Sequence, residues 1–432
     1  GQVVHQWNVP FVPLQGQLLP NGNVVVMGLS PNQNPFKPMT LMMNIMGGHA
    51  DRLIELNWQG DIVFKHTNEA MHHDFVKLPN GNYLYLAWEV VPKSLRQKIR
   101  GGFEDSEHLL FVPEHLRWKY LKGLLFRGQD MLRMFNDYVV EINPQGQVLW
   151  RWHANEHLDP SVDIIGPLYR REEWLHSNSI GILGNSNIIL SCRNTDSILI
   201  IDRKTGRIIS RWGNVAYLDK VSGRLKYRAP KAAMQARLFD EVLGGPHDAQ
   251  EIPPGLPGAG HLTIYNNGLY TGSSRVVELD LATRRVAWQS AFSGIGRIPF
   301  SRFMGSAQRL FNGNTLVCEG NNGRFFQVTK DNKIVWEYIN PYDGSPLFRG
   351  AVYKIRAYPP EYCSQFNKLP PAAGLAVEPQ PMIPADQVAS AKLAAEQAAR
   401  RASLVRLAVS FAILFLSVAL SFQLGRRLAR RR

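Results

Sequence analysis

Three histidines and one arginine have residue types and spacing that suit a group-transfer site. His73 lies in HHDFVKLP and His247 in GPHDAQ, and the two stretches align without a gap as HDFVKLP against HDAQEIP. His176 opens HSNSI, and Arg193 follows it in SCRN. Because each histidine stands near the start of a strand-like run, we expect the four side chains to converge on one axis.

Imidazole and guanidinium groups suit different parts of one reaction. A neutral imidazole is a nucleophile or proton carrier near neutral pH, whereas a guanidinium is a rigid fork of donors that fits a tetrahedral oxyanion. The set therefore predicts transfer of a sulfuryl or phosphoryl group. One histidine would attack, while the other groups hold the oxygens and protonate the leaving oxygen. The sequence contains no GxxxxGK[ST] loop, so a nucleotide donor bound on such a loop is not expected.

Two other interpretations of the histidines remain open. A histidine in a strand is commonly a structural residue with its own hydrogen bonds. Three imidazoles also leave the open fourth position of a catalytic zinc site, although a neighbouring arginine would repel the metal. The recurrence of the histidines at matching positions favours an oxyanion site, for which we expect neither metal nor cofactor.

An internal repeat positions these residues. One recurring piece is a pair of β-rich runs around an Asx or Gly turn, which is typical of a hairpin. Its five copies occupy residues 53–65, 138–152, 198–212, 275–289 and 324–338. A second piece, Leu-Pro-Asn-Gly-Asn or a close variant followed by apolar residues, begins most clearly at Leu19, Leu78 and Leu310. Two hairpins make four strands, which is one propeller blade.

The ends of this region look like the two halves of one more blade. Residues 1–7 are similar to an outer strand and residues 351–359 to an inner strand. Pairing them would leave no open sheet edge, so we predict an all-β fold, a six-bladed β-propeller over residues 1–362 closed by its N- and C-terminal strands. Because the chain begins inside a motif, we expect a longer precursor with a signal peptide.

One insertion interrupts the second repeat. Residues 91–137 are basic, rich in Leu and Arg, and partly helical in pattern. Such an insertion on one face of a ring is either a lid or docking surface, or a surface elaboration that packs against a blade edge.

The C-terminal part has a different composition. Residues 363–385 are rich in Pro and Ala and predict an extended linker. A helical pattern covers residues 386–432, and 407–425 are nineteen residues without a charge. That length is about 28 Å of helix, enough for a single transmembrane span. Five arginines follow, which favours a cytoplasmic tail and a propeller on the periplasmic side of the inner membrane.

Charge and cysteine content narrow the range of partners. The chain has 432 residues and a formal net charge of +14, but residues 400–432 contain eight arginines, so the remainder is only mildly basic. Because no zinc-finger spacing or basic and aromatic recognition motif is present, nucleic-acid binding is not expected. The three cysteines, an odd number, argue against a full disulfide framework.

The motifs resemble those of the aryl sulfotransferase family, the bacterial arylsulfate sulfotransferases that use no nucleotide sulfate donor. The resemblance covers most of residues 1–362 and is carried by HHDFVKLPNGN, WLHSNSI, SCRNTDSILIIDRKTGRII, GPHDAQ and SAQRLFNGNTLVCEGNNGRFFQV. It implies an exported six-bladed propeller without a cofactor. Such an enzyme moves a sulfuryl group from a phenolic sulfate to another phenol by a ping-pong route through a sulfohistidine.

The resemblance also implies a role for each residue. His247 matches the histidine that becomes sulfated, and His73, His176 and Arg193 match the groups that bind and polarise the sulfuryl oxygens. From its position beside His247, we expect Asp248 to orient that ring. The insertion and the C-terminal span are additions to the family pattern, and they leave room for a partner protein in the membrane.

The preferred prediction is therefore a membrane-anchored arylsulfate sulfotransferase. The alternative, from a different class, is a non-catalytic propeller subunit that docks on a membrane protein complex. A scaffold has no reason to hold four such side chains within joint reach of one small oxyanion, so their arrangement separates the two hypotheses.

Overall fold

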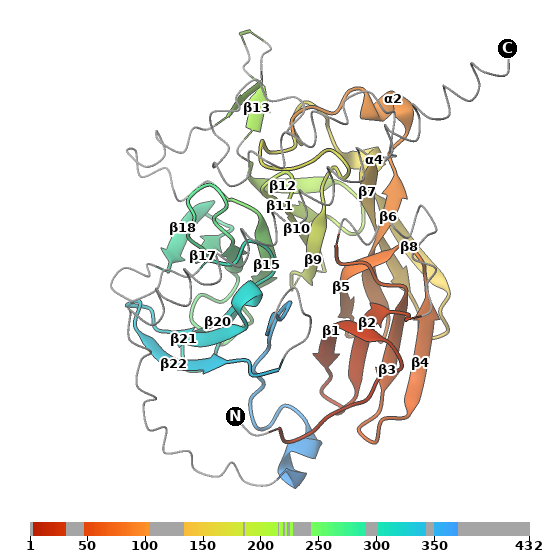
Figure 1. Ribbon diagram of the computed structural model, residues 1–432, viewed down its shortest axis with the longest axis vertical. Helices are drawn as coiled ribbons and strands as arrows, with labels where there is room; N and C mark the ends of the chain where they lie inside the picture. The colour runs from red at the N-terminus through yellow and green to blue at the C-terminus, as the bar shows by residue number, and fades with distance from the viewer. Residues whose placement is uncertain are drawn as a thin grey trace, which may run out of the picture. The chain divides into compact units, whose positions relative to one another are not determined.

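Five four-stranded antiparallel sheets form the framework of the described chain in the computed structural model (Figure 1). The structure describes residues 3–31, 47–102, 134–184, 186–214, 216–218, 221–222, 225–227, 243–290, 300–342 and 350–369. In every sheet the four strands follow one another in chain order, which is the up-and-down order of a propeller blade. The predicted all-β, propeller-like architecture is confirmed for these five sheets.

The strands of the five sheets have the following bounds. The first sheet contains β1 (Val12–Leu18), β2 (Val24–Leu29), β3 (Arg52–Leu56) and β4 (Ile62–Thr67). The second contains β5 (Met71–Lys77), β6 (Tyr83–Val90), β7 (Phe135–Ile142) and β8 (Val148–His153). The third contains β9 (Ser177–Ile182), β10 (Ile188–Cys192), β11 (Ser197–Ile201) and β12 (Ile208–Gly213). The fourth contains β15 (Pro246–Glu251), β16 (Leu262–Asn266), β17 (Arg275–Asp280) and β18 (Arg285–Gln289). The fifth contains β19 (Ser306–Arg309), β20 (Thr315–Glu319), β21 (Arg324–Val328) and β22 (Ile334–Ile339).

Shorter elements lie within, between and after the sheets in chain order. A small hairpin, β13 (Ala216–Leu218) with β14 (Leu225–Tyr227), follows the third sheet. The single-turn helices are α2 (Lys93–Arg96), α4 (Ala154–His157), η4 (Gly320–Asn322) and η5 (Ser364–Lys368).

The Leu-Pro-Asn-Gly-Asn motif forms the turn between the first and second strands. At Leu19 the leucine N–H donates to Asn23 O at 2.8 Å, and the Gly22 N–H donates back to Leu19 O at 2.9 Å. Gly22 has a φ of 85°, a left-handed conformation that glycine adopts without steric cost. The same bonds recur at Leu78 and Leu310, so the repeated motif marks the same turn in three blades.

The sheets pack side by side through their buried strands. Every residue of β10 and β11 is buried, whereas no residue of the outer strand β12 is fully buried. A hydrophobic core that includes Trp152 and Trp174 joins the second sheet to the third, and smaller clusters join the other neighbours. The innermost strands β1, β5, β9, β15 and β19 contact one another in this order. The start of each innermost strand is therefore brought near the start of the next.

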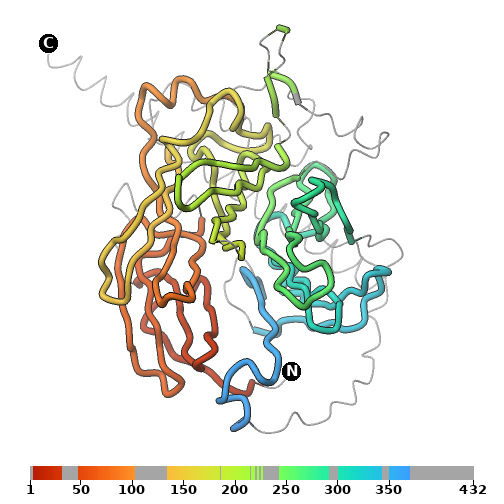
Figure 2. The backbone as a smooth tube through the Cα atoms, turned by 180° about the vertical axis from the view of Figure 1, so that it is seen from behind, coloured from red at the N-terminus to blue at the C-terminus, as the bar shows by residue number. Residues whose placement is uncertain are grey.

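The segment 350–358 connects the fifth sheet to the first. It runs between the first sheet, drawn in red, and the fifth, drawn in cyan (Figure 2). The Gly305 N–H donates to Tyr353 O at 3.2 Å on the fifth sheet, and the Leu18 N–H donates to the Tyr358 hydroxyl at 3.3 Å on the first. Lys354 Nζ lies 2.8 Å from both carboxylate oxygens of Asp74 in β5.

The sixth blade stays a prediction. Neither of the segments expected to form it contains a strand within the described residues, 3–7 and 351–359. Residues 3–7 instead contact the turn between β3 and β4, where the Trp7 indole N–H donates to Asn57 O at 2.9 Å. Residues 351–359 make their contacts largely through side chains rather than through a backbone ladder.

Two other predicted regions lie mainly outside the described residues. Of the insertion, the structure describes 91–102 and 134–137, and β7 already begins at Phe135. Of the C-terminal regions it describes 363–369, so the rest of the linker and the predicted span 407–425 lie outside. None of the helices that the structure describes has the length and apolar character that a membrane crossing needs.

We expect Lys354→Met to destabilise the protein strongly. The Lys354 side chain is 9% exposed and its partner Asp74 is fully buried, so the substitution leaves the buried Asp74 carboxylate without its counter-charge. Breaking a buried pair in this way costs about 3–5 kcal/mol of unfolding free energy. Denaturant unfolding of both proteins measures the difference. The matched control is Lys333→Met, which removes an exposed lysine paired with Asp331 and should leave the midpoint unchanged. Equal midpoints for all three proteins would contradict this account.

Candidate active site

Irregular backbone at the start of the inner strands aims the candidate side chains. The pairing of β5 with β6 shifts register between His72 and Phe75, and that of β15 with β16 shifts between His247 and Gln250. His73 and His176 have φ values of 51° and 49°, in the left-handed region that non-glycine residues rarely adopt. Such bulges redirect side chains, and such strain clusters at functional sites.

The structure brings all four predicted site residues together. The rings of His73 and His176 meet edge to face with centroids 4.7 Å apart. The positive charge of Arg193, just after β10, is near enough to lower the pKa of each of the three imidazoles, and His247 and His176 also affect one another. Burial is the larger cause in every case, so all three rings are neutral at physiological pH.

His247 has one unprotonated ring nitrogen, Nε2. Its Nδ1 lies 2.7 Å from Asn267 Oδ1 and 3.0 Å from Gly245 O, both acceptors, so Nδ1 carries the proton. Its Nε2 accepts the Met304 N–H at 3.2 Å, which also requires an unprotonated Nε2. Burial, and then the charge of Arg193, lower the pKa of His247 to about 3. Nε2 is therefore the nitrogen that can act as a nucleophile.

Asn267 holds His247 in this state, and sequence reasoning missed it. The Asn267 side chain is fully buried, and its amide nitrogen donates to Ser301 O at 2.8 Å and to Met304 O at 2.9 Å. These two bonds fix Oδ1 toward His247. A signal was present in the repeat, because Asn267 follows β16 at the position where Arg193 follows β10.

The expectation that Asp248 orients His247 is wrong. Asp248 Oδ1 accepts from Arg356 Nη2 at 2.6 Å and from Gln250 Nε2 at 3.0 Å, and its Oδ2 accepts the Ala307 N–H at 3.3 Å. Asp248 lies in the bulge between His247 and Gln250 and has a φ of 52°, and its carboxylate is committed to the segment 350–358 and the fifth sheet.

His176 rests against a buried carboxyl group. Its Nδ1 contacts Glu173 Oε2, and Glu173 Oε1 accepts the Trp88 indole N–H at 2.7 Å. Burial raises the pKa of Glu173 to about 8, and burial together with Arg193 lowers the pKa of His176 to about 3. Glu173 was not predicted, although it lies only three residues before His176.

The position of His73 is determined by contacts with the neighbouring His72 ring and with Gly48. His73 Nδ1 lies 2.9 Å from His72 Nδ1, and His72 Nε2 lies 3.4 Å from Asp137 Oδ1. The His73 N–H donates to Gly48 O at 2.7 Å, and a side chain at Gly48 would overlap the His73 ring. The Tyr353 ring lies 6.5 Å from His73, and its buried hydroxyl has no hydrogen-bond partner among the described residues.

Two arginines give the site its positive charge. The guanidinium of Arg193 lies 4.9 Å from the centre of the Tyr169 ring. Arg302, which sequence reasoning did not single out, is half-buried, and burial followed by the charge of Arg193 lowers its pKa. In the described part of the chain, no ion pair joins either arginine to a carboxylate. Such a pair of guanidinium groups favours an anionic ligand.

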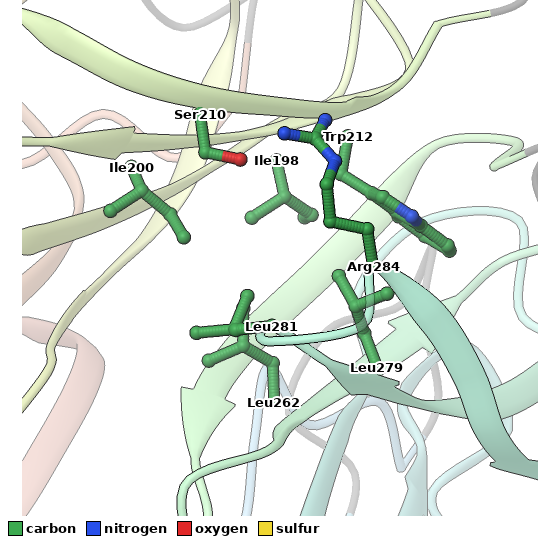
Figure 3. A pocket seen from close by; sticks show the side chains of 8 residues that line it. All are labelled: Ile198, Ile200, Ser210, Trp212, Leu262, Leu279, Leu281 and Arg284. Atoms are coloured by element: carbon green, nitrogen blue, oxygen red, sulfur yellow. The ribbon is translucent and has the colours of Figure 1, made fainter.

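A small apolar hollow lies away from the four predicted site residues. Within the described ranges, no three His, Cys, Asp or Glu side chains are disposed to hold a metal ion. A small hollow of about 10 Å³ lies between the third and fourth sheets, lined largely by apolar side chains such as Ile198, Trp212 and Leu262 (Figure 3). None of the four predicted site residues lines it.

Comparison with known proteins identifies one family. The model of the arylsulfotransferase (ASST) family matches residues 124–352, which include His176, Arg193 and His247 but not His73. No curated protein sequence is significantly similar to the chain.

Solved structures share little sequence with the chain. A protein of unknown function from Bacteroides caccae is 12% identical over 71% of this chain and 81% of its own, with a TM-score of 0.38. An inactive virginiamycin B lyase from Staphylococcus aureus with quinupristin is 9% identical over 80% and 89%, with a TM-score of 0.39. AztD from Citrobacter koseri is 8% identical over 73% and 57%, with a TM-score of 0.29.

We expect His247 to stay neutral at pH 5 with its proton on Nδ1. A histidine with an ordinary pKa of about 6.5 is mostly protonated at that pH, whereas the folded-state pKa of His247 is about 3. Side-chain ¹⁵N NMR of histidine-labelled protein reads the protonated nitrogen directly, and His247→Gln assigns the signal. A doubly protonated ring at pH 5, or a proton on Nε2, would contradict the hydrogen bonds to Asn267 and Met304.

Proposed function

Because the chain belongs to the arylsulfotransferase family, we propose that it moves a sulfuryl group from a phenolic sulfate ester to another phenol through a sulfohistidine at His247. The observation that carries the proposal is the state of this ring. Its Nε2 has no proton, and Arg193 stands close enough to influence its charge. A nucleophilic nitrogen beside an unpaired guanidinium suits attack on the sulfur of an anionic ester.

The first half-reaction breaks the bond between sulfur and the phenolic oxygen. The Nε2 lone pair of His247 forms a bond to sulfur, and the electron pair of the broken bond leaves on the phenolic oxygen, which takes up a proton. The sulfated ring still carries the Nδ1 proton and is therefore cationic. Asn267 Oδ1 and Gly245 O accept from that nitrogen and stabilise the charge as it develops.

The second half-reaction reverses these changes with a new phenol. The oxygen of the acceptor attacks sulfur, the bond from sulfur to Nε2 breaks, and the acceptor gives up its proton. Arg193 and His73 would hold the sulfuryl oxygens in both directions, His176 would face the oxygen of the leaving or incoming phenol, and Arg302 adds positive charge nearby. The route needs no cofactor, since the histidine itself carries the group between donor and acceptor.

We also propose that the protein acts at a membrane. The apolar stretch 407–425 and the five arginines after it would anchor the chain in the inner membrane as a single span, with the propeller on the periplasmic side. A sixth blade, built from residues 1–7 and 351–359, would complete the ring, and a partner protein would be reached through the span or the insertion 91–137.

Mixing the protein briefly with an aryl sulfate should add one sulfuryl group to it and release one phenol. Intact-protein mass spectrometry measures the adduct, and absorbance follows the phenol. The adduct should disappear when a second phenol is added, because the acceptor takes the group. His247→Ala should form none, whereas His157→Ala, at a partly buried histidine stacked on Trp152, should behave as wild type. Folded wild-type protein that gives neither adduct nor phenol with several donors would instead favour the non-catalytic docking subunit.

We expect the full-length protein to fractionate as an integral membrane protein. An apolar helix buried in lipid is released by detergent but not by high salt or alkaline carbonate. Protease added to spheroplasts should digest the propeller, because it faces the periplasm, while a cytoplasmic marker protein survives. Release by salt alone would exclude the span, and protection of the propeller until the cells are lysed would reverse the proposed orientation.

A further inference from the structure

Glu173 is a buried carboxyl group that contacts a candidate site histidine from behind. Its side chain is 5% exposed, its Oε2 contacts His176 Nδ1, and its Oε1 accepts the Trp88 indole N–H. Trp88 is itself held by stacking on His72, with ring centroids 4.4 Å apart. Because Nδ1 of His176 is occupied by Glu173, Nε2 is the nitrogen left to reach a ligand.

A ping-pong transfer between phenols has to move a proton twice. The departing phenolate takes up a proton in the first half-reaction, and the incoming phenol gives one up in the second. An unperturbed phenol has a pKa of about 10, so both transfers matter at neutral pH for an ordinary phenol. Between the two half-reactions the protein has given up one proton. Groups in the site must therefore stay without that proton until the acceptor phenol replaces it.

We propose that Glu173 and His176 carry this deficit as a two-position proton store, an inference that rests on the proposed function. In the first half-reaction His176 Nε2 gives its proton to the leaving phenolic oxygen, and the carboxyl proton of Glu173 moves to Nδ1. In the second half-reaction the acceptor phenol gives its proton to Nε2, and the Nδ1 proton returns to Glu173. Each turnover restores the starting state, and no further reactant is consumed.

The charges around Glu173 and His176 favour a starting state in which Glu173 is protonated and His176 is neutral. The titratable groups that influence or are influenced by Glu173 and His176 are Arg193, His72, His73, His247, Asp137 and Glu172. Burial raises the pKa of Glu173 to about 8 although Arg193 opposes this, and burial and Arg193 together disfavour a charged His176. At pH 7 the proton therefore lies on the carboxyl group, and His176 is neutral with its proton on Nε2.

The sharpest test compares leaving groups in Glu173→Gln. The carboxamide is isosteric: its oxygen accepts from Trp88 and its nitrogen donates to His176 Nδ1, but it has no proton to pass on. Adduct formation from phenyl sulfate should slow by roughly 10²-fold, the usual contribution of a positioned proton donor. Adduct formation from 4-nitrophenyl sulfate should change little, because that phenolate leaves without protonation. Glu172→Gln, at the neighbouring carboxylate, is the matched control and should show wild-type rates with both sulfates.

The pH dependence of wild-type protein gives a second test that does not depend on any variant. The first half-reaction needs the protonated pair, so its rate with phenyl sulfate should fall as pH rises through about 8. Discharge of a preformed adduct to phenol needs the deprotonated pair, so its rate should rise over the same range. In Glu173→Gln both inflections should be lost.

The outcomes separate the failure of this inference from the failure of the proposed function. An equal loss with both sulfates, no loss with either, or unchanged pH inflections in Glu173→Gln would overturn the proton store while the adduct on His247 still stands. The absence of any adduct on wild-type protein would remove the proposed function and this inference with it.

Discussion

Buried carboxylates at the inner edge of the sheets hold the site region together. Asp74 and Asp248 each stand beside a candidate site histidine, and each accepts the backbone N–H of the next sheet's inner strand, at Ile180 and Ala307. Both also face Lys354 in the segment that joins the fifth sheet to the first. Asp74 and Asp248 therefore fix the distance between neighbouring sheets. Through Lys354 they also hold the segment 350–358, which connects the fifth sheet to the first. The convergence of the histidines depends on this spacing, since they come from three different sheets.

A second constraint is the mismatch of charge in the site. Burial drives the imidazoles and the carboxyl groups of Glu173 and Asp137 toward their neutral forms. The arginines remain charged, because a guanidinium stays protonated at any physiological pH. Among the described residues the site therefore has positive charge and few counter-ions, which an anionic ester would balance. Arg193 would thus contribute to the attraction for an anionic ester, and after burial it is a further cause of the lowered pKa of the imidazoles.

The features that the sequence predicted are those determined by short local motifs of the repeat. Asn-Gly turns at Leu19, Leu78 and Leu310 determine where hairpins form, so five sheets and the positions of His73, His176, His247 and Arg193 were predictable. Glu173 and Arg302 were not, because their roles arise from contacts between loops that no repeat encodes. Asn267 did carry a signal, since it follows β16 as Arg193 follows β10, and that signal was missed. The sixth blade depends on pairing the two ends of the chain, and Asp248 shows that adjacency in sequence says little about which face a strand residue serves.

The Met304 amide gives the resting site a further property. It donates to the lone pair of His247 Nε2 from a backbone with a φ of 64°, a conformation that costs a non-glycine residue energy. Any group that bonds to Nε2 has to displace this amide. In the proposed reaction this amide would shield the nucleophile from small, adventitious electrophiles, whereas a molecule that also binds the two arginines would gain enough free energy to displace it. Reagents designed to label His247 would accordingly need an anionic group that binds the two arginines as well as an electrophilic centre.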